Sequence, residues 1–371
     1  MPLCNLPAHF AGRPISILVR ATNWIGDAIM TLPAVRTIRA NFPAARITVL
    51  AQPWMADIFR ANPAVDRVLL YHKKSCHAGL LGMWRLSREL AAEKFDLAIL
   101  LQNAFEAALL ARLAGIPVVA GYNRDARGLL LSQAVPVTQE IKARHQVFYY
   151  QHLVQELGLT PTENRLALPL AAGDTEWALE LVASLARPLI GLNPGAAYGP
   201  AKCWPSERYG EAAQRLVARR GGTVLVFGTQ ADTQAAGTIS GRVGSIVDLT
   251  GRTTLGQAMA LIGQCDLFIT NDSGLMHVAA AHDTPLVAIF GSTDPVATGP
   301  FSERSVVVRR PLECSPCLQT HCRGDFQCMT QIGVDEVVAA AEDLLAVGWA
   351  PPTNPAANGG PPDAMTPQYY A

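Results

Sequence analysis

Short apolar runs alternate with longer amphipathic segments along most of the chain. Continuous apolar runs without polar alternation are typical of strands buried on both faces, as in parallel sheets. In the first half we expect strands at residues 16–20, 46–51, 65–71, 96–101 and 117–121, with helices at 28–41, 79–92, 105–114 and 144–157. This alternation predicts a doubly wound α/β domain.

A second α/β series follows a looser connection at residues 161–172. A chain of 371 residues is also too long for one ordinary core and suits two domains. The expected strands of the second series are 188–193, 222–227, 245–249, 266–270 and 285–290, and the last helix is 334–346. The predicted organisation is an N-terminal extension (1–14), two Rossmann-like α/β domains (15–172 and 173–350), and a disordered tail rich in Pro, Ala, Asn and Gly (351–371).

Charge is unevenly distributed although the formal net charge is zero. Residues 1–145 contain 17 Lys/Arg and 9 Asp/Glu, whereas residues 181–371 contain 12 and 16. A general nucleic-acid binder would be basic overall, so we expect no nucleic-acid partner. The basic half fits an anionic surface or substrate, and an ordinary uneven surface is the alternative. The candidate cations are Lys73, Lys74, Arg124, Arg127, Lys142 and Arg144.

The sequence predicts a cytoplasmic protein. The most apolar long stretch, 97–121, is interrupted by polar residues, and the first 14 residues do not resemble a secretory signal. The cysteines should then be mostly thiols or metal ligands and not a disulfide framework. Four of them, in the loop 314–328, have a spacing that fits a structural zinc site, reduced packing thiols or disulfides: Cys314, Cys317, Cys322 and Cys328.

Three loops that follow expected strands contain candidate binding or catalytic residues, because open parallel sheets bind ligands at the carboxyl ends of their strands. Residues 271–277 place Asp272, Ser273 and Gly274 before a helix that carries His277, and such a helix start accepts phosphate oxygens. Without a ligand, the same residues would simply cap the helix.

The other two loops are residues 23–27 and 193–205. In the first, Asp27 is either a functional carboxylate or an ordinary acid in the first turn of a helix. In the second, Lys202 supplies a point charge for a phosphate. The Gly-x-Gly-x-x-Gly and Walker fingerprints are absent from the sequence. The pattern therefore favours a nucleotide diphosphate held by a lysine and helix N-termini, with no cofactor required for catalysis.

Several motifs together resemble a known family. Residues 23–30, 194–205, 227–228, 249–255 and 271–277 occur in the order found in the ADP-heptose:lipopolysaccharide heptosyltransferases (glycosyltransferase family nine), and the chain is most similar to the heptosyltransferase II group. The resemblance covers about residues 15–348. It implies a B-type glycosyltransferase fold, with two domains facing a cleft, the acceptor on the first domain and the ADP-sugar on the second.

The resemblance also implies substrates and roles. The partners would be ADP-heptose and a Kdo-bearing lipid A acceptor at the cytoplasmic face of the inner membrane, with peripheral attachment of the enzyme. Asp27 would be the general base of an inverting transfer, and Lys202 the partner of the pyrophosphate. Donor-binding residues would be Gly195, Ala196, Lys202, Asp232, Thr253, Asp272, Ser273, Gly274 and His277; acceptor-binding residues would be Asn23, Trp24 and Arg124.

Other functions are compatible with the same sequence features. A related transferase with another nucleotide sugar or acceptor, heptosyltransferase I activity, and a sugar epimerase on the same frame are the enzyme alternatives. A binding protein that uses the four cysteines as a zinc knuckle belongs to another class. The acidic second half, without interleaved basic and aromatic residues near Cys314, disfavours that alternative.

Overall fold

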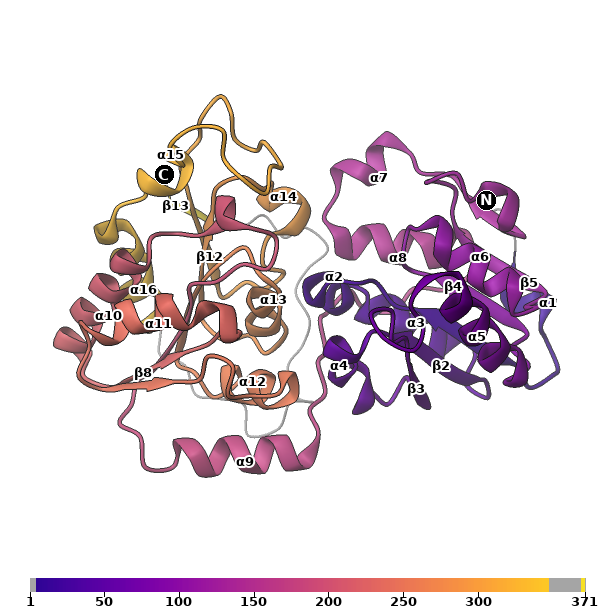
Figure 1. Ribbon diagram of the computed structural model, residues 1–371, viewed down its shortest axis with the longest axis horizontal. Coiled ribbons are helices and arrows are strands. Elements are labelled where there is room, and N and C mark those ends of the chain that lie inside the picture. Colours follow the sequence, from indigo (N-terminus) through magenta and orange to yellow (C-terminus); the bar gives the residue numbers. More distant parts are fainter. Residues whose placement is uncertain (1–4, 347–367, 371) are drawn as a thin grey trace. The chain divides into compact units, whose positions relative to one another are not determined.

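The computed structural model describes residues 5–346 and 368–370 and divides into two compact units, residues 1–169 and 170–371 (Figure 1). The sequence analysis placed the boundary three residues later, after residue 172. Each unit is built on a parallel sheet flanked by helices, as predicted. In the parts that the structure describes, no helix combines the length and the apolar character needed to cross a bilayer.

Unit 1 contains a six-stranded parallel sheet in the order β3-β2-β1-β4-β5-β6. Its strands are β1 Ser16–Arg20, β2 Arg46–Ala51, β3 Arg67–Leu70, β4 Leu97–Leu100, β5 Val118–Tyr122 and β6 Gln133–Val135. Its helices are α1 Leu6–His9, α2 Ile25–Met30, α3 Leu32–Asn41, α4 Asp57–Arg60, α5 Gly79–Ala92, α6 Phe105–Leu113, α7 Gln139–Ala143 and α8 Gln146–Glu156, with 3₁₀ turns η1 Pro53–Met55 and η2 Gly128–Leu130.

The core of unit 1 follows from the uninterrupted apolar strands. Leu86 and Leu90 of α5 pack against sheet residues such as Leu18 and Leu100, in a cluster that also includes α6. Helices α3 and α8 pack against each other, and α2 also contacts α8. Burial of such side chains contributes about 1.5–3 kcal/mol each relative to exposure. The sheet is thereby a fixed platform for the loops at its carboxyl edge.

Unit 2 contains a seven-stranded sheet in the order β13-β12-β11-β10-β7-β8-β9. Its strands are β7 Leu189–Asn193, β8 Thr223–Val226, β9 Ile246–Asp248, β10 Leu267–Asn271, β11 Leu286–Phe290, β12 Ser305–Arg309 and β13 Gln368–Tyr370. Its helices are α9 Ala172–Val182, α10 Ser206–Arg220, α11 Thr233–Ser240, α12 Leu255–Ile262, α13 Gly274–Ala281, α14 Pro295–Thr298, α15 Gln327–Thr330 and α16 Val334–Ala346, with 3₁₀ turns η3 Pro200–Lys202 and η4 Gln230–Asp232.

The sequence analysis missed three strands. It did not place β6, β12 or β13, although the valine run in Ser305–Arg309 is a strand signal. The disordered-tail prediction is wrong for Gln368–Tyr370, which pair in parallel with β12. Residues 351–367 and 371 of that predicted tail lie outside the described residues.

Candidate active site

In unit 2, Lys202 and Asp272 meet at the carboxyl edge of the sheet. Lys202 Nζ donates to Asp272 Oδ2 at 2.5 Å, and both side chains are mostly buried, with 13% and 6% of their surface exposed. Thr293, which follows β11, donates its hydroxyl to the same carboxylate oxygen at 2.6 Å. The Lys202 ammonium also lies 4.6 Å from the centre of the Tyr198 ring. An ammonium has three N–H donors, so this pairing orients the lysine and uses one of them.

Asn271, the last residue of β10, anchors the loop that carries Lys202. Its fully buried side chain accepts hydrogen bonds at 3.0 Å from both the Trp204 backbone N–H and the Tyr209 hydroxyl. Its amide donates to the Pro194 carbonyl at 2.6 Å. These bonds hold both ends of the loop 194–204 against the strand, so that Lys202 is placed by a rigid support.

The start of α13 is built by residues from two strands. Ser273 is the N-cap of this eight-residue helix, and its hydroxyl accepts from the Met276 N–H at 3.3 Å. Asn193, at the end of β7, donates to the same hydroxyl at 2.7 Å. Gly274 is half-buried at the helix start, and His277 is buried in the next turn. The helix N-terminus beside Lys202's partner Asp272 is suited to phosphate oxygens.

The remaining predicted donor residues line the neighbouring strand ends. Gly195 lies so close to Asp232 that a Cβ would stand 2.2 Å from Asp232 Oδ1, so only glycine fits. The other oxygen, Asp232 Oδ2, accepts from the Thr229 N–H at 2.7 Å, which closes a capping box on η4. Ala196 and Thr253 are half-buried, and Thr253 directly precedes the Thr254 N-cap of α12. The structure thus places all nine predicted donor residues in unit 2, in segments that follow strand ends.

In unit 1, Asp27 lies in the first turn of α2, directly after β1, and is half-buried. Burial and then the nearby Asp27 carboxylate raise the pKa of Tyr150 on α8 well above its usual value. Asp27 therefore lies near Tyr150, in keeping with the contact between α2 and α8.

The residues predicted to bind the acceptor have defined local partners. Asn23 Oδ1 accepts from Arg20 at 3.0 Å and from Gln52 at 2.7 Å. Trp24 is 54% exposed at the start of α2. Arg124 donates to the Tyr149 hydroxyl at 3.4 Å, where Asn103 also donates at 2.9 Å. Sequence analysis did not name Tyr149, because nothing in the sequence of α8 distinguishes this tyrosine from its neighbour Tyr150.

Arg127 was proposed from the sequence as a phosphate contact, and the structure corrects this. Its side chain is fully buried, donating to the Tyr122 carbonyl at 2.8 Å and to Asn103 Oδ1 at 2.9 Å. Burial lowers its pKa to about 10, so the guanidinium stays charged at neutral pH. Arg127 therefore stabilises the loop after β5 and does not present its charge to a ligand.

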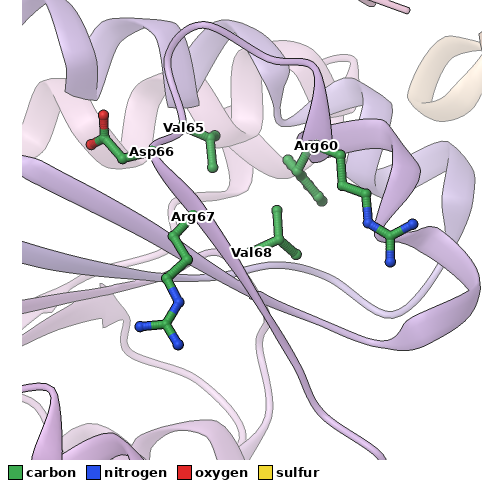
Figure 2. Close-up of a pocket in the computed structure, with 6 residues that line it drawn as sticks. Arg60, Val65, Asp66, Arg67 and Val68 are labelled. Atoms are coloured by element: carbon green, nitrogen blue, oxygen red, sulfur yellow. The ribbon is translucent and has the colours of Figure 1, made fainter. Parts of the chain in front are cut away.

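A small surface pocket lies at the opposite, amino-terminal end of β3 (Figure 2), where its lining includes Arg60, Asp66 and Arg67. Each of these charges already has a partner: Arg60 pairs with Asp57, Asp66 with Arg39, and Arg67 with Glu93. The pocket is also at the wrong edge of the sheet for a ligand site of this fold. We therefore assign it no chemical role.

The loop with the four cysteines, residues 314–328, contacts the loop 194–204 that carries Lys202. Tyr198 donates its hydroxyl to the Leu318 carbonyl at 2.7 Å, and the Ala201 N–H donates to the Thr320 carbonyl at 3.2 Å. Gly199, at a φ of 144°, lies so close that a Cβ would stand 2.5 Å from the Thr320 carbonyl oxygen. The conformation of residues 318–320 is thus coupled to that of the loop bearing Lys202.

The four cysteines of this loop are neighbours and are reduced. Burial first, and then Cys314, Cys317 and Cys322, raise the pKa of Cys328. The seven cysteines that the structure describes are all free thiols. Within residues 5–346 and 368–370, no group of three or more His, Cys, Asp or Glu side chains is arranged to hold a metal ion. The structural zinc site stays a prediction.

Elemental analysis of protein purified without chelators tests it. If the prediction holds, about one zinc per chain will be found, because structural sites are four-coordinate and closed. A chelator should then lower the Tm, and it should also weaken ADP binding because this loop contacts the Lys202 loop. A Cys314→Ser/Cys317→Ser variant should lose the metal, whereas Cys76→Ser, at an exposed thiol elsewhere, should keep it. Metal-free wild-type protein would contradict the prediction.

Comparison with known proteins identifies the family. The profile of glycosyltransferase family 9 (heptosyltransferase) matches residues 83–326. Lipopolysaccharide heptosyltransferase 2 of Salmonella typhimurium is 34% identical over 308 residues, which cover 80% of this chain and 88% of that protein.

Two solved structures are similar over most of the chain. The structure of Escherichia coli ADP-heptose lps heptosyltransferase II is 31% identical with a TM-score of 0.76, covering 90% of this chain and 99% of that one. A glycosyl transferase family 9 structure from Veillonella parvula is 27% identical with a TM-score of 0.81, covering 90% and 98%. The two-domain fold of B-type glycosyltransferases, predicted from the resemblance, is confirmed. On the strength of this match and of the strand-end site, the chain belongs to glycosyltransferase family 9.

Proposed function

We propose that this protein transfers L-glycero-D-manno-heptose from ADP-heptose to the heptose of a Kdo-bearing lipid A inner core, with inversion at the anomeric carbon. The observation that carries the proposal is the Lys202–Asp272 pair beside the N-terminus of α13. Similarity to heptosyltransferases of the second type over 80% of the chain supports the sugar and the acceptor. The enzyme would work at the cytoplasmic face of the membrane that holds the acceptor.

The leaving group requires stabilisation on the donor side. Breaking the bond between the sugar and the diphosphate develops negative charge on ADP and positive charge at the anomeric carbon. Lys202, oriented by Asp272, has N–H donors to spare for the diphosphate, and the first N–H groups of α13 add a fixed positive dipole. No metal is required for this step in the proposal, since a lysine and a helix start supply the charge.

The acceptor hydroxyl must lose a proton as it attacks. Asp27 is the carboxylate that we assign to this role, as a general base at the carboxyl end of β1. One base without a covalent nucleophile gives one displacement and therefore inversion. Arg124, 44% exposed beside the Tyr149 hydroxyl, would contact acceptor phosphate or carboxylate groups. Asn23 and Trp24, in the loop between β1 and α2, would also contact the acceptor.

Nucleotide selectivity tests the donor half of the proposal. ADP at a hundred times its Kd should add about 2.7 kcal/mol to the stability of the unit that binds it, which corresponds to a Tm increase of several degrees. UDP and NAD at the same concentration should have little effect. A Tm shift with UDP but not ADP would favour the alternative of another nucleotide sugar.

Acceptor selectivity tests the other half in the same preparation. With ADP-heptose, mass spectrometry should show one added heptose on a Kdo-lipid A acceptor that already carries its first heptose. The same acceptor without that heptose should remain unchanged. Addition to the heptose-free acceptor instead would assign heptosyltransferase I activity.

A further inference from the structure

Most of the large apolar side chains exposed on unit 1 lie in segments that follow the ends of its strands. All pairs in this sheet are parallel, so the strands end at the same edge. In the described part of this unit, seven of the eight exposed large apolar residues lie in segments that follow the ends of β1 to β5: Trp24, Trp54, Leu80, Leu81, Trp84, Phe105 and Leu129. The eighth, Leu113, is at the end of α6. Asp27 also lies in such a segment, the one that follows β1.

The largest exposed group is on the first half of α5, the helix labelled α5 in Figure 1. Leu80, Leu81 and Trp84 are 81%, 84% and 61% exposed. At about 100° per residue, these three side chains and those of Arg85 and Arg88 fall within roughly 140° of the helix circumference. The opposite side is buried, with Leu86 and Leu90 at 2% and 0% exposure. The helix is therefore apolar on two sides: one packs against the core of unit 1, and the other is exposed.

A rigid support holds this half of the helix. Gly82 is buried so closely against the preceding loop that a Cβ would stand 2.1 Å from the backbone carbonyl carbon of His77. His77 is itself buried and accepts the His72 N–H at its Nδ1 at 3.1 Å. The exposed leucines and tryptophan thus project from a fixed surface and not from a frayed helix end.

The charges around this apolar group are positive. Lys74, Arg85 and Arg88 are exposed, and within the described parts of the chain no carboxylate lies within ion-pair distance of them. The nearby acids have other partners: Glu106 pairs with Lys73, Glu89 with His77, and Glu93 with Arg46 and Arg67. Lys74 also lies 5.7 Å from the centre of the exposed Trp54 ring. A tryptophan and leucines surrounded by unpaired cations match the interface of an anionic bilayer.

We propose that the first half of α5 docks on the surface of an anionic lipid bilayer. Leu80, Leu81 and Trp84 enter the headgroup region, and Lys74, Arg85 and Arg88 contact lipid phosphates. We refer to these six residues as the α5 face. The inference rests on the proposed function in one respect, that the acceptor is a membrane lipid. Because the α5 face and Asp27 both lie in segments that follow strands of one parallel sheet, docking would bring this part of unit 1 to the acceptor headgroup.

Vesicle flotation with the full-length protein tests this proposal. Binding is expected for vesicles of phosphatidylglycerol mixed with phosphatidylcholine, and it should weaken as salt is added. Pure phosphatidylcholine vesicles should bind far less. Leu80→Ser/Leu81→Ser/Trp84→Ser should lower the partition coefficient by at least about tenfold, and Lys74→Gln/Arg85→Gln/Arg88→Gln should lower binding to the anionic vesicles selectively.

The matched control is Leu113→Ser/Leu179→Ser, which removes two leucines of 50% and 48% exposure outside the α5 face and should bind as wild type. Unchanged vesicle binding by the triple serine variant would overturn the proposal. So would a change in its oligomeric state without loss of vesicle binding, which would assign the face to a second copy of the chain. The vesicles carry neither sugar nucleotide nor acceptor, so failure of the proposed transfer activity would not alter this result. Conversely, transfer to a deacylated acceptor should be normal in the triple variant.

Discussion

Replacing Asp27 by Asn is expected to reduce kcat by about 10²- to 10⁴-fold, the range contributed by a positioned general base. The amide has nearly the same shape as the carboxylate, so the first turn of α2 and its packing against α8 should persist. An amide cannot accept the proton of the attacking hydroxyl, which leaves that proton to water. The measurement is kcat at saturating ADP-heptose and acceptor.

Two comparisons isolate the chemical step. ADP binding by calorimetry should be within about twofold of wild type, because the predicted donor residues are in unit 2 and the loss is confined to the transition state. Asp57→Asn is a matched control, since Asp57 is also a half-buried acid in the first turn of a helix of unit 1. That control should retain wild-type kcat. Near wild-type turnover by the Asp27→Asn enzyme would return Asp27 to the role of a helix N-terminal acid.

Strand-end loops were the part of the site that the sequence could predict. Asp272 stands directly after β10, whereas Asp27 and Lys202 lie in the segments that follow β1 and β7; within each sheet, parallel strands bring such positions to one edge. The neighbouring sequence therefore predicts where these three residues lie. The residues that surround them in space could not be predicted in this way. Thr293 contacts Asp272 across 21 residues, and Tyr150 lies near Asp27 from a helix more than a hundred residues later.

The wrong assignment of Arg127 has a related cause. An arginine in a polar loop looks like a ligand contact in sequence, whereas its long side chain here turns inward to the Tyr122 carbonyl and Asn103. Whether a guanidinium points out or in depends on carbonyls that only the fold supplies. The same holds for β13, which exists as a strand because β12 offers an edge to Gln368–Tyr370. Composition alone gave that segment no strand signal.

Lys202→Ala is expected to weaken ADP binding by about 10- to 100-fold, the loss of a charged hydrogen bond, and to lower kcat by about a further 10²- to 10³-fold. The diphosphate is anionic in the ground state and more so as the sugar departs, so both the affinity for ADP and kcat should fall. Direct measurements are the Kd for ADP and kcat at saturating donor. An unaffected kcat would show that Lys202 binds the diphosphate equally in both states.

The Lys202→Ala change has a second consequence that must be separated from the first. It leaves the Asp272 carboxylate, 6% exposed, with the Thr293 hydroxyl but without its cation, and an unpaired buried charge costs stability and would repel a diphosphate. The double variant Lys202→Ala/Asp272→Asn removes that charge as well. If Lys202 stabilises the leaving group directly, the double variant should regain stability, measured as Tm, while its kcat stays low. Recovery of kcat along with Tm would instead mean that Lys202 serves only to neutralise Asp272, and the leaving-group charge would then rest on the N-terminus of α13.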